Sequence, residues 1–152
     1  MKTVSLEEAK AMIGKESGVS DWLKIEQDRI NQFADVTEDH QFIHINPDMA
    51  KMTPFGGTVA HGFLTLSMLV KMGETASITL EGVKMGVNYG FDKVRFLAPV
   101  PSGAKVRGRF VVAAVEEKRP GQVLITYDVT VEIEGGEKPA LIAQWMGMQF
   151  TG

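Results

Sequence analysis

The sequence predicts an α+β protein in which an antiparallel sheet wraps around one buried helix. Helical spacing of apolar residues is confined to the first half of the chain, and strand patterns fill the second half. The turns between the predicted strands are only a few residues long. Such short connections join antiparallel neighbours, because a parallel crossover needs about a dozen residues or more.

Length and composition narrow the class of protein. The chain has 152 residues, enough to bury a core, and we expect residues 1–152 to form one domain. A net charge of −3 argues against general nucleic-acid binding, and the lack of cysteine excludes disulfides and thiolate chemistry. No apolar run approaches the roughly 20 residues that cross a bilayer, and the charged start does not fit a signal peptide. We therefore expect a cytoplasmic protein that does not bind membranes.

The first elements are predicted from capping and spacing. Ser5 and Glu8 form the capping box of a helix over residues 5–13. A short strand is predicted over residues 22–25. Apolar residues at helical spacing then indicate a second helix over residues 27–36.

The middle and the end of the chain differ in character. Residues 37–57 are rich in turn formers, with a helical turn predicted over residues 47–52 because proline suits a first helical position. Apolar side chains cover nearly the full circumference of residues 63–72, which predicts a helix buried on most sides. Four strands are then predicted over residues 83–98, 104–117, 122–134 and 140–151.

All three histidines lie close together in the sequence, near a carboxylate. Asp39 and His44 are five residues apart in the turn-rich segment, and His61 precedes the buried helix. An imidazole beside a carboxylate can move protons at neutral pH, which suits adding or removing water next to a polarised carbonyl. From the residues alone a second interpretation stays open: Asp39 caps the loop and His44 is a packed histidine. His61 is either a third polar group of the site or, as we favour, a structural residue at the helix start.

Three segments resemble the MaoC-like dehydratase family over essentially the whole chain. They are FADVTEDHQFIHINP (33–47), PFGGTVAHGF (54–63) and NYGFDKVRFLAPV (88–100). The family's catalytic Asp, and its catalytic His five residues later, correspond to Asp39 and His44. The sequence is most similar to the branch named after nodulation protein N, which includes actinobacterial (R)-specific enoyl-CoA hydratases. Where many relatives have Asn-Pro between the two residues, this chain has Gln41-Phe42.

The resemblance implies a hot dog fold, a long central helix wrapped by an antiparallel sheet, paired into a homodimer. The implied activity is reversible hydration of trans-2-enoyl-CoA to (R)-3-hydroxyacyl-CoA, with no metal or other cofactor. Alternatives are a dehydratase of acyl-carrier-protein substrates, a hot dog thioesterase and a non-enzymatic acyl-CoA binding module. An intact pair of Asp39 and His44 argues against the last of these.

Other residues are weaker candidates for the site. Gly62 would let a thioester carbonyl approach the amide groups at the helix start, or it only relieves crowding between helix and sheet. Tyr89 and Gly90 are candidates for lining the acyl or thioester site. His40 and His44 have the spacing of a metal-binding pair, but no further ligand is evident.

Residues 93–109 contain five basic residues and no acidic residue. They would meet the phosphates of coenzyme A or, as we favour for most of them, form a solvated charged sheet face. They are Lys93, Arg95, Lys105, Arg107 and Arg109.

Overall fold

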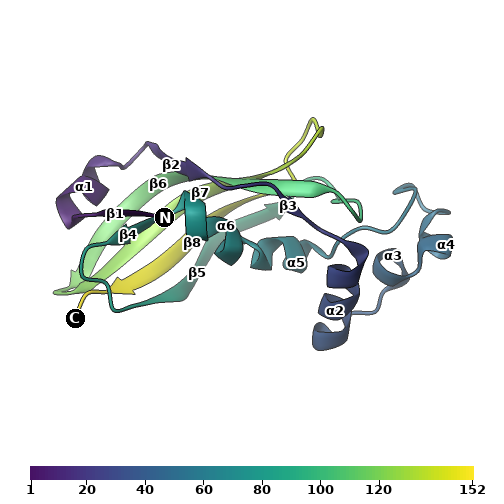
Figure 1. Ribbon diagram of the computed structural model, residues 1–152, viewed down its shortest axis with the longest axis horizontal. Helices are drawn as coiled ribbons and strands as arrows, with labels where there is room; N and C mark the ends of the chain where they lie inside the picture. Colours follow the sequence, from purple (N-terminus) through teal and green to yellow (C-terminus); the bar gives the residue numbers. More distant parts are fainter.

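An antiparallel sheet forms the body of the protein in the computed structural model, which describes residues 1–152 (Figure 1). Its strand order is β2-β6-β7-β8-β5, and β3 pairs with β6. A separate parallel pair joins β1 to β4. The strands are β1 (Lys2–Val4), β2 (Glu16–Val19), β3 (Leu23–Lys24), β4 (Ile78–Leu80), β5 (Met85–Phe96), β6 (Lys105–Arg119), β7 (Gln122–Ile133) and β8 (Leu141–Phe150). The predicted α+β class and antiparallel sheet are confirmed.

Alternating side chains decide which face of the sheet packs against the core. In β6, Val106, Phe110 and Val112 are buried, whereas Lys105 is exposed and Arg107 is partly exposed. This is the period-2 pattern of a strand with one face in the core. The long strands curve around a helix that lies across them (Figure 1).

The helices are short, and most of them precede the long strands. They are α1 (Leu6–Ala11), α2 (Gln27–Thr37), α3 (Phe42–Ile45), α4 (Pro47–Ala50), α5 (Gly62–Ser67) and α6 (Leu69–Ala76). The predicted capping box of α1 is present, with the Glu8 amide donating to the Ser5 hydroxyl at 3.1 Å. Helices α2, α3 and α4 lie together beyond one end of the sheet, and both chain termini lie toward the opposite end (Figure 1).

The central helix is less enclosed than the sequence predicts. Leu64, Leu69 and Met72 are buried, but Phe63 is 67% exposed and Val70 is 55% exposed. The prediction of burial on most sides is therefore wrong for the single chain. The sheet wraps only one side of α5 and α6, so that apolar side chains remain uncovered on the other.

Four short elements were not predicted: β1, β2, β4 and α3. Strand β1 exists because Lys2 pairs with Ile78, far away in the sequence. Strand β2 pairs with β6 through an irregular register at Glu16 and Gly18. Elements of three or four residues carry too little periodicity to be recognised before their partners are known.

Gly18 marks a close approach between a strand and the central helix. A Cβ atom at Gly18 would lie 2.9 Å from Ala76 Cα and 3.0 Å from the Ala76 carbonyl oxygen. Both are backbone atoms, so neither can move without shifting α6. We expect Gly18→Ala to lower the free energy of unfolding by about 1–3 kcal/mol, as overpacking does. Urea denaturation measures this change.

Gly86→Ala is the matched control for Gly18→Ala. It adds the same methyl group to a strand, but the nearest atom would be the Met148 carbonyl oxygen at 3.9 Å. Its effect should stay within about 0.5 kcal/mol. Equal effects of the two substitutions would contradict the close-approach explanation for Gly18.

Candidate acid–base site

The candidate site begins where α2 ends. Glu38, the residue after α2, has a left-handed backbone with φ of 60°. This turn ends the helix and directs the chain into the loop that carries Asp39. The Asp39 side chain is exposed, and its Oδ1 accepts a hydrogen bond from the Gln41 amide at 3.4 Å. Asp39 is therefore at the surface, with its carboxylate accessible.

His44 lies on α3 and is only 7% exposed. Its Nδ1 is 2.7 Å from the carbonyl oxygen of Val59. Since a carbonyl can only accept, Nδ1 carries the proton, and Nε2 keeps a free lone pair. The Gln27 side chain donates to the His44 carbonyl at 2.7 Å and accepts from the Thr58 hydroxyl at 2.7 Å. His44 is thus held in a tautomer in which Nε2 can accept a proton.

The structure brings His61 into the same cluster. Its ring stacks on the His44 ring with a centroid distance of 3.8 Å, and Nε2 lies 3.0 Å from the Asp39 carbonyl oxygen. Ligand-type atoms of Asp39, His44 and His61 all lie within 4.8 Å of one another. The sequence predicts that Asp39 and His44 lie together, whereas it favours a structural role for His61 over a place in the site. The only signal was the position of His61 at the start of the apolar helix.

His40 is outside this cluster. Its Nε2 lies 2.9 Å from Asp35 Oδ1, and both side chains are largely exposed. The spacing of His40 and His44 therefore does not produce a metal-binding pair. The cluster of Asp39, His44 and His61 offers three possible metal ligands. Its two imidazole rings, however, are stacked, and their planes are only 23° apart. Lone pairs in nearly parallel planes converge poorly on one ion, so this geometry suits proton transfer better than metal binding.

A small apolar cavity is lined by the two sequence neighbours of His61, although none of Asp39, His44 and His61 lines it. It has a volume of about 270 Å³, and its lining includes Ala60 and Gly62 on either side of His61 in the sequence. Phe96 from the end of β5 also lines it. A Cβ atom at Gly62 would lie 2.9 Å from the Phe96 ring. Gly62 thus both borders the cavity and relieves crowding, which keeps its two interpretations open.

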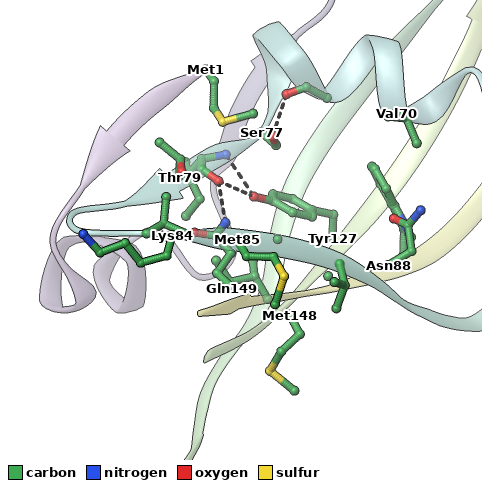
Figure 2. A pocket seen from close by; sticks show the side chains of 18 residues that line it. Met1, Val70, Ser77, Thr79, Lys84, Met85, Asn88, Tyr127, Met148 and Gln149 are labelled. Carbon is green, nitrogen blue, oxygen red and sulfur yellow. Dashed lines mark hydrogen bonds between the residues drawn. The ribbon is translucent and has the colours of Figure 1, made fainter. Parts of the chain in front are cut away.

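A larger cavity lies elsewhere, between α6 and one end of the sheet (Figure 2). Its volume is about 430 Å³, and none of the three clustered residues lines it. Two of its polar side chains bind the Ile78 backbone: the Tyr127 hydroxyl accepts from the Ile78 amide at 2.9 Å, and Gln149 donates to the Ile78 carbonyl at 3.0 Å. Burial raises the pKa of Tyr127 to about 12. These groups attach β4 to the sheet and do not form an acid–base site.

Tyr89 and Gly90 lie on β5, at the edge of the sheet. In the register with β8, Asn88 pairs with Gly147 and Gly90 pairs with Met146, so Tyr89 is the extra residue of a bulge. Tyr89 is exposed, and neither Tyr89 nor Gly90 lines either of the two cavities described above. The structure therefore does not join them to the cluster, and their role in the site is left without support.

The basic residues do not form one patch. Strands β5 and β6 are separated by β7 and β8, so Lys93 and Arg95 lie apart from the basic residues of β6. Arg107 and Arg109 bind the Glu132 carboxylate at 2.8 and 2.6 Å. The Arg107 hydrogen bond lowers the pKa of Glu132 despite the opposing effect of desolvation, and Arg109 adds to it. These two arginines form the charged sheet face that the sequence favoured.

Comparisons with known proteins identify the family of this chain. Residues 8–134 match the model of the MaoC like domain. The chain is 47% identical over 147 residues to Nodulation protein N of Rhizobium leguminosarum bv. viciae, covering 96% of this chain and 91% of the relative. It is 46% identical over 140 residues to 3-hydroxyacyl-thioester dehydratase Z of Mycobacterium tuberculosis H37Rv, covering 92% of each. The solved (R)-hydratase from A. caviae involved in PHA biosynthesis superposes with a TM-score of 0.73 at 22% identity, covering 89% of this chain and 94% of that one.

An antiparallel sheet wrapped around a central helix defines a hot dog fold. The family match and the curated relatives place the chain in the hydratase and dehydratase class. The chain belongs to the MaoC-like domain family. No helix in the structure is long and apolar enough to span a bilayer.

Proposed function

We propose that this protein is an (R)-specific enoyl-CoA hydratase, which adds water reversibly to trans-2-enoyl-CoA. The observation that carries the proposal is the convergence of Asp39 and His44: ligand-type atoms of the two side chains lie within 4.8 Å of each other, and Nδ1 of His44 is occupied by the Val59 carbonyl, which leaves Nε2 as the basic nitrogen. Relatives named as a 3-hydroxyacyl-thioester dehydratase and a 3-hydroxybutyryl-CoA dehydratase support this class of substrate. The (R) configuration follows from the family resemblance.

The reaction needs two proton movements on one face of the substrate. The water oxygen bonds to the β-carbon and loses a proton, while the α-carbon gains one. We assign His44 Nε2 as the base that takes the proton from water, because its lone pair is free. Asp39 orients the same water, takes up the proton that His44 has gained and delivers it to the α-carbon, so both groups return to their starting states and the water supplies both the hydroxyl group and the hydrogen. Both groups act from one side, so the addition is syn.

Negative charge develops on the thioester oxygen during the addition. The backbone N–H groups of Gly62 and Phe63 begin α5 and have no acceptor within the helix, whereas the Leu64 amide already donates to the His61 carbonyl at 3.1 Å; Gly62 has no side chain to block access to the free groups. The small cavity beside Gly62 is where we place the reacting thioester.

Crotonyl-CoA is the substrate for the first test. Loss of the enoyl absorbance, with a product that an (R)-specific 3-hydroxyacyl-CoA dehydrogenase oxidises, supports the proposal. Release of free coenzyme A thiol without loss of the alkene would instead identify a thioesterase. Faster turnover of a crotonyl group on acyl-carrier protein than on coenzyme A would identify the carrier-protein dehydratase. A longer series of enoyl-CoA substrates then defines the chain length.

Gly62→Ala tests the placement of the thioester. We expect kcat to fall about tenfold or more, because the methyl group would stand between the carbonyl and its donors. Steady-state kinetics on crotonyl-CoA measures this. Phe96→Ala removes the crowding that a methyl group at position 62 would meet. Restoration of activity in the double variant Gly62→Ala/Phe96→Ala, relative to Phe96→Ala alone, would show that Gly62 serves packing only.

We also expect a homodimer that pairs β5 with its copy. Strand β5 is a sheet edge of 12 residues, and its exposed apolar side chains include Met85, Val87 and Phe91. A long apolar edge of this kind needs pairing or cover. Sedimentation at micromolar concentration should give twice the chain mass. Val87→Lys should weaken the dimer, whereas Val36→Lys on exposed α2 should not. A wild-type monomer would contradict this prediction.

A further inference from the structure

We propose that His61 is a positioning residue that holds Asp39 in place for the proposed hydration, on which this inference rests. His61 is 3% exposed, so it cannot contact substrate freely. It nevertheless contacts both members of the pair: its Nε2 bonds to the Asp39 backbone, and its ring stacks on His44.

The hydrogen bond from His61 is the main restraint on the Asp39 loop. Asp39 takes part in two hydrogen bonds, and the other one is a long local contact with the Gln41 amide. The bond between His61 Nε2 and the Asp39 carbonyl therefore connects the loop to the start of α5, 22 residues later in the chain. Without it, the Asp39 loop keeps only local contacts, the Gln41 amide bond and the exposed pair of His40 and Asp35.

Two aromatic contacts fix the orientation of the His61 ring. The His44 ring stacks on it at 3.8 Å, and the Phe33 ring lies at 4.9 Å. Because the acceptor of Nε2 is a carbonyl, Nε2 carries the proton and Nδ1 is the bare nitrogen. Nδ1 is buried and has no hydrogen-bond partner.

The unpartnered Nδ1 argues against a purely packing role. A buried polar atom without a partner is unfavourable, and a phenyl ring would fill the same space without one. What a phenyl ring cannot provide is the N–H donor for the Asp39 carbonyl. The imidazole is therefore explained by the hydrogen bond rather than by its shape.

Two substitutions separate the ring from the hydrogen bond. His61→Phe keeps a ring against His44 and loses the donor, whereas His61→Gln loses the ring and keeps an N–H donor. We expect His61→Phe to lower kcat on crotonyl-CoA at least about tenfold with little change in KM, since small misplacements of a reacting group have effects of this size. His61→Gln should recover a substantial part of that loss. Wild-type kcat in His61→Phe would overturn the proposal.

A double-mutant cycle tests whether His61 acts through Asp39. In the Asp39→Asn background the carboxylate is already absent, so His61→Phe should lower kcat less than about threefold further. A full, multiplicative loss in that background would overturn the proposal, because it would mean that His61 acts independently of Asp39.

A readout without substrate distinguishes failure of this proposal from failure of the proposed function. The carbonyl ¹³C shift of Asp39 reports its hydrogen bond, and it should change in His61→Phe and be largely retained in His61→Gln. An unchanged shift in His61→Phe would overturn the positioning role whatever the activity. Absence of hydration by the wild type, with the expected shifts present, would overturn the enzymatic assignment alone.

Discussion

Asp39→Asn and His44→Gln are each expected to lower turnover of crotonyl-CoA at least about a hundredfold, the scale of lost acid–base catalysis. Asn at position 39 can still accept a hydrogen bond from water but cannot deliver a proton. Gln at position 44 can still donate to the Val59 carbonyl but has no basic nitrogen. Steady-state rates of hydration at saturating substrate measure both losses.

The chain offers a control with the same chemical groups. His40 and Asp35 form an exposed pair at 2.9 Å, in the same stretch of sequence but outside the cluster. His40→Gln and Asp35→Asn should leave turnover within about twofold of the wild type, because surface pairs contribute little. Near-normal rates in both Asp39→Asn and His44→Gln would end the proposed mechanism. Equal losses in the control pair would point to a folding defect of the whole segment.

Phe110→Ala is expected to lower the free energy of unfolding by about 3–5 kcal/mol, the largest stability effect that we predict. Phe110 is 0% exposed, and its ring contacts Tyr127 at 5.4 Å and Trp145 at 6.0 Å between ring centroids. Removing it leaves a cavity between β6 and its neighbours in the sheet. Urea denaturation with tryptophan fluorescence measures the change.

Val36→Ala is the surface counterpart of this core substitution. Val36 is 80% exposed on α2, so removing its apolar atoms leaves no cavity, and the change should stay within about 0.5 kcal/mol. A loss below about 1 kcal/mol for Phe110→Ala would contradict the packing described for the core.

The long strands could be predicted because their patterns are local. Strand β7 was expected over residues 122–134 and spans Gln122–Ile133, and β8 was expected over residues 140–151 and spans Leu141–Phe150. Alternating side chains and glycine turns specify such strands without knowledge of their neighbours. The helical turn α3 had no comparable pattern, because four residues do not complete two turns.

The candidate site was only partly accessible from sequence. Asp39 and His44 are five residues apart, so a single turn can bring them together, and the family motif marks them. His61 is 17 residues beyond His44. It joins the cluster only because the chain, after passing through α4, returns to place the start of α5 against His44. The basic residues of β5 and β6 were neighbours only in sequence, because two strands lie between them in the sheet.

The amino-acid sequence by itself determined the α+β class, the four long strands and the family, and it singled out Asp39 and His44 as the proposed acid–base pair. These depend on periodicity, turn formers and short motifs, all of which act over a few residues. Only the tertiary structure decided the tautomer of His44, the stacking of His61 on it and the exposed side of the central helix. Each of these depends on a contact between segments that are distant in sequence, such as the hydrogen bond between His44 and the Val59 carbonyl. Local sequence patterns do not specify such contacts.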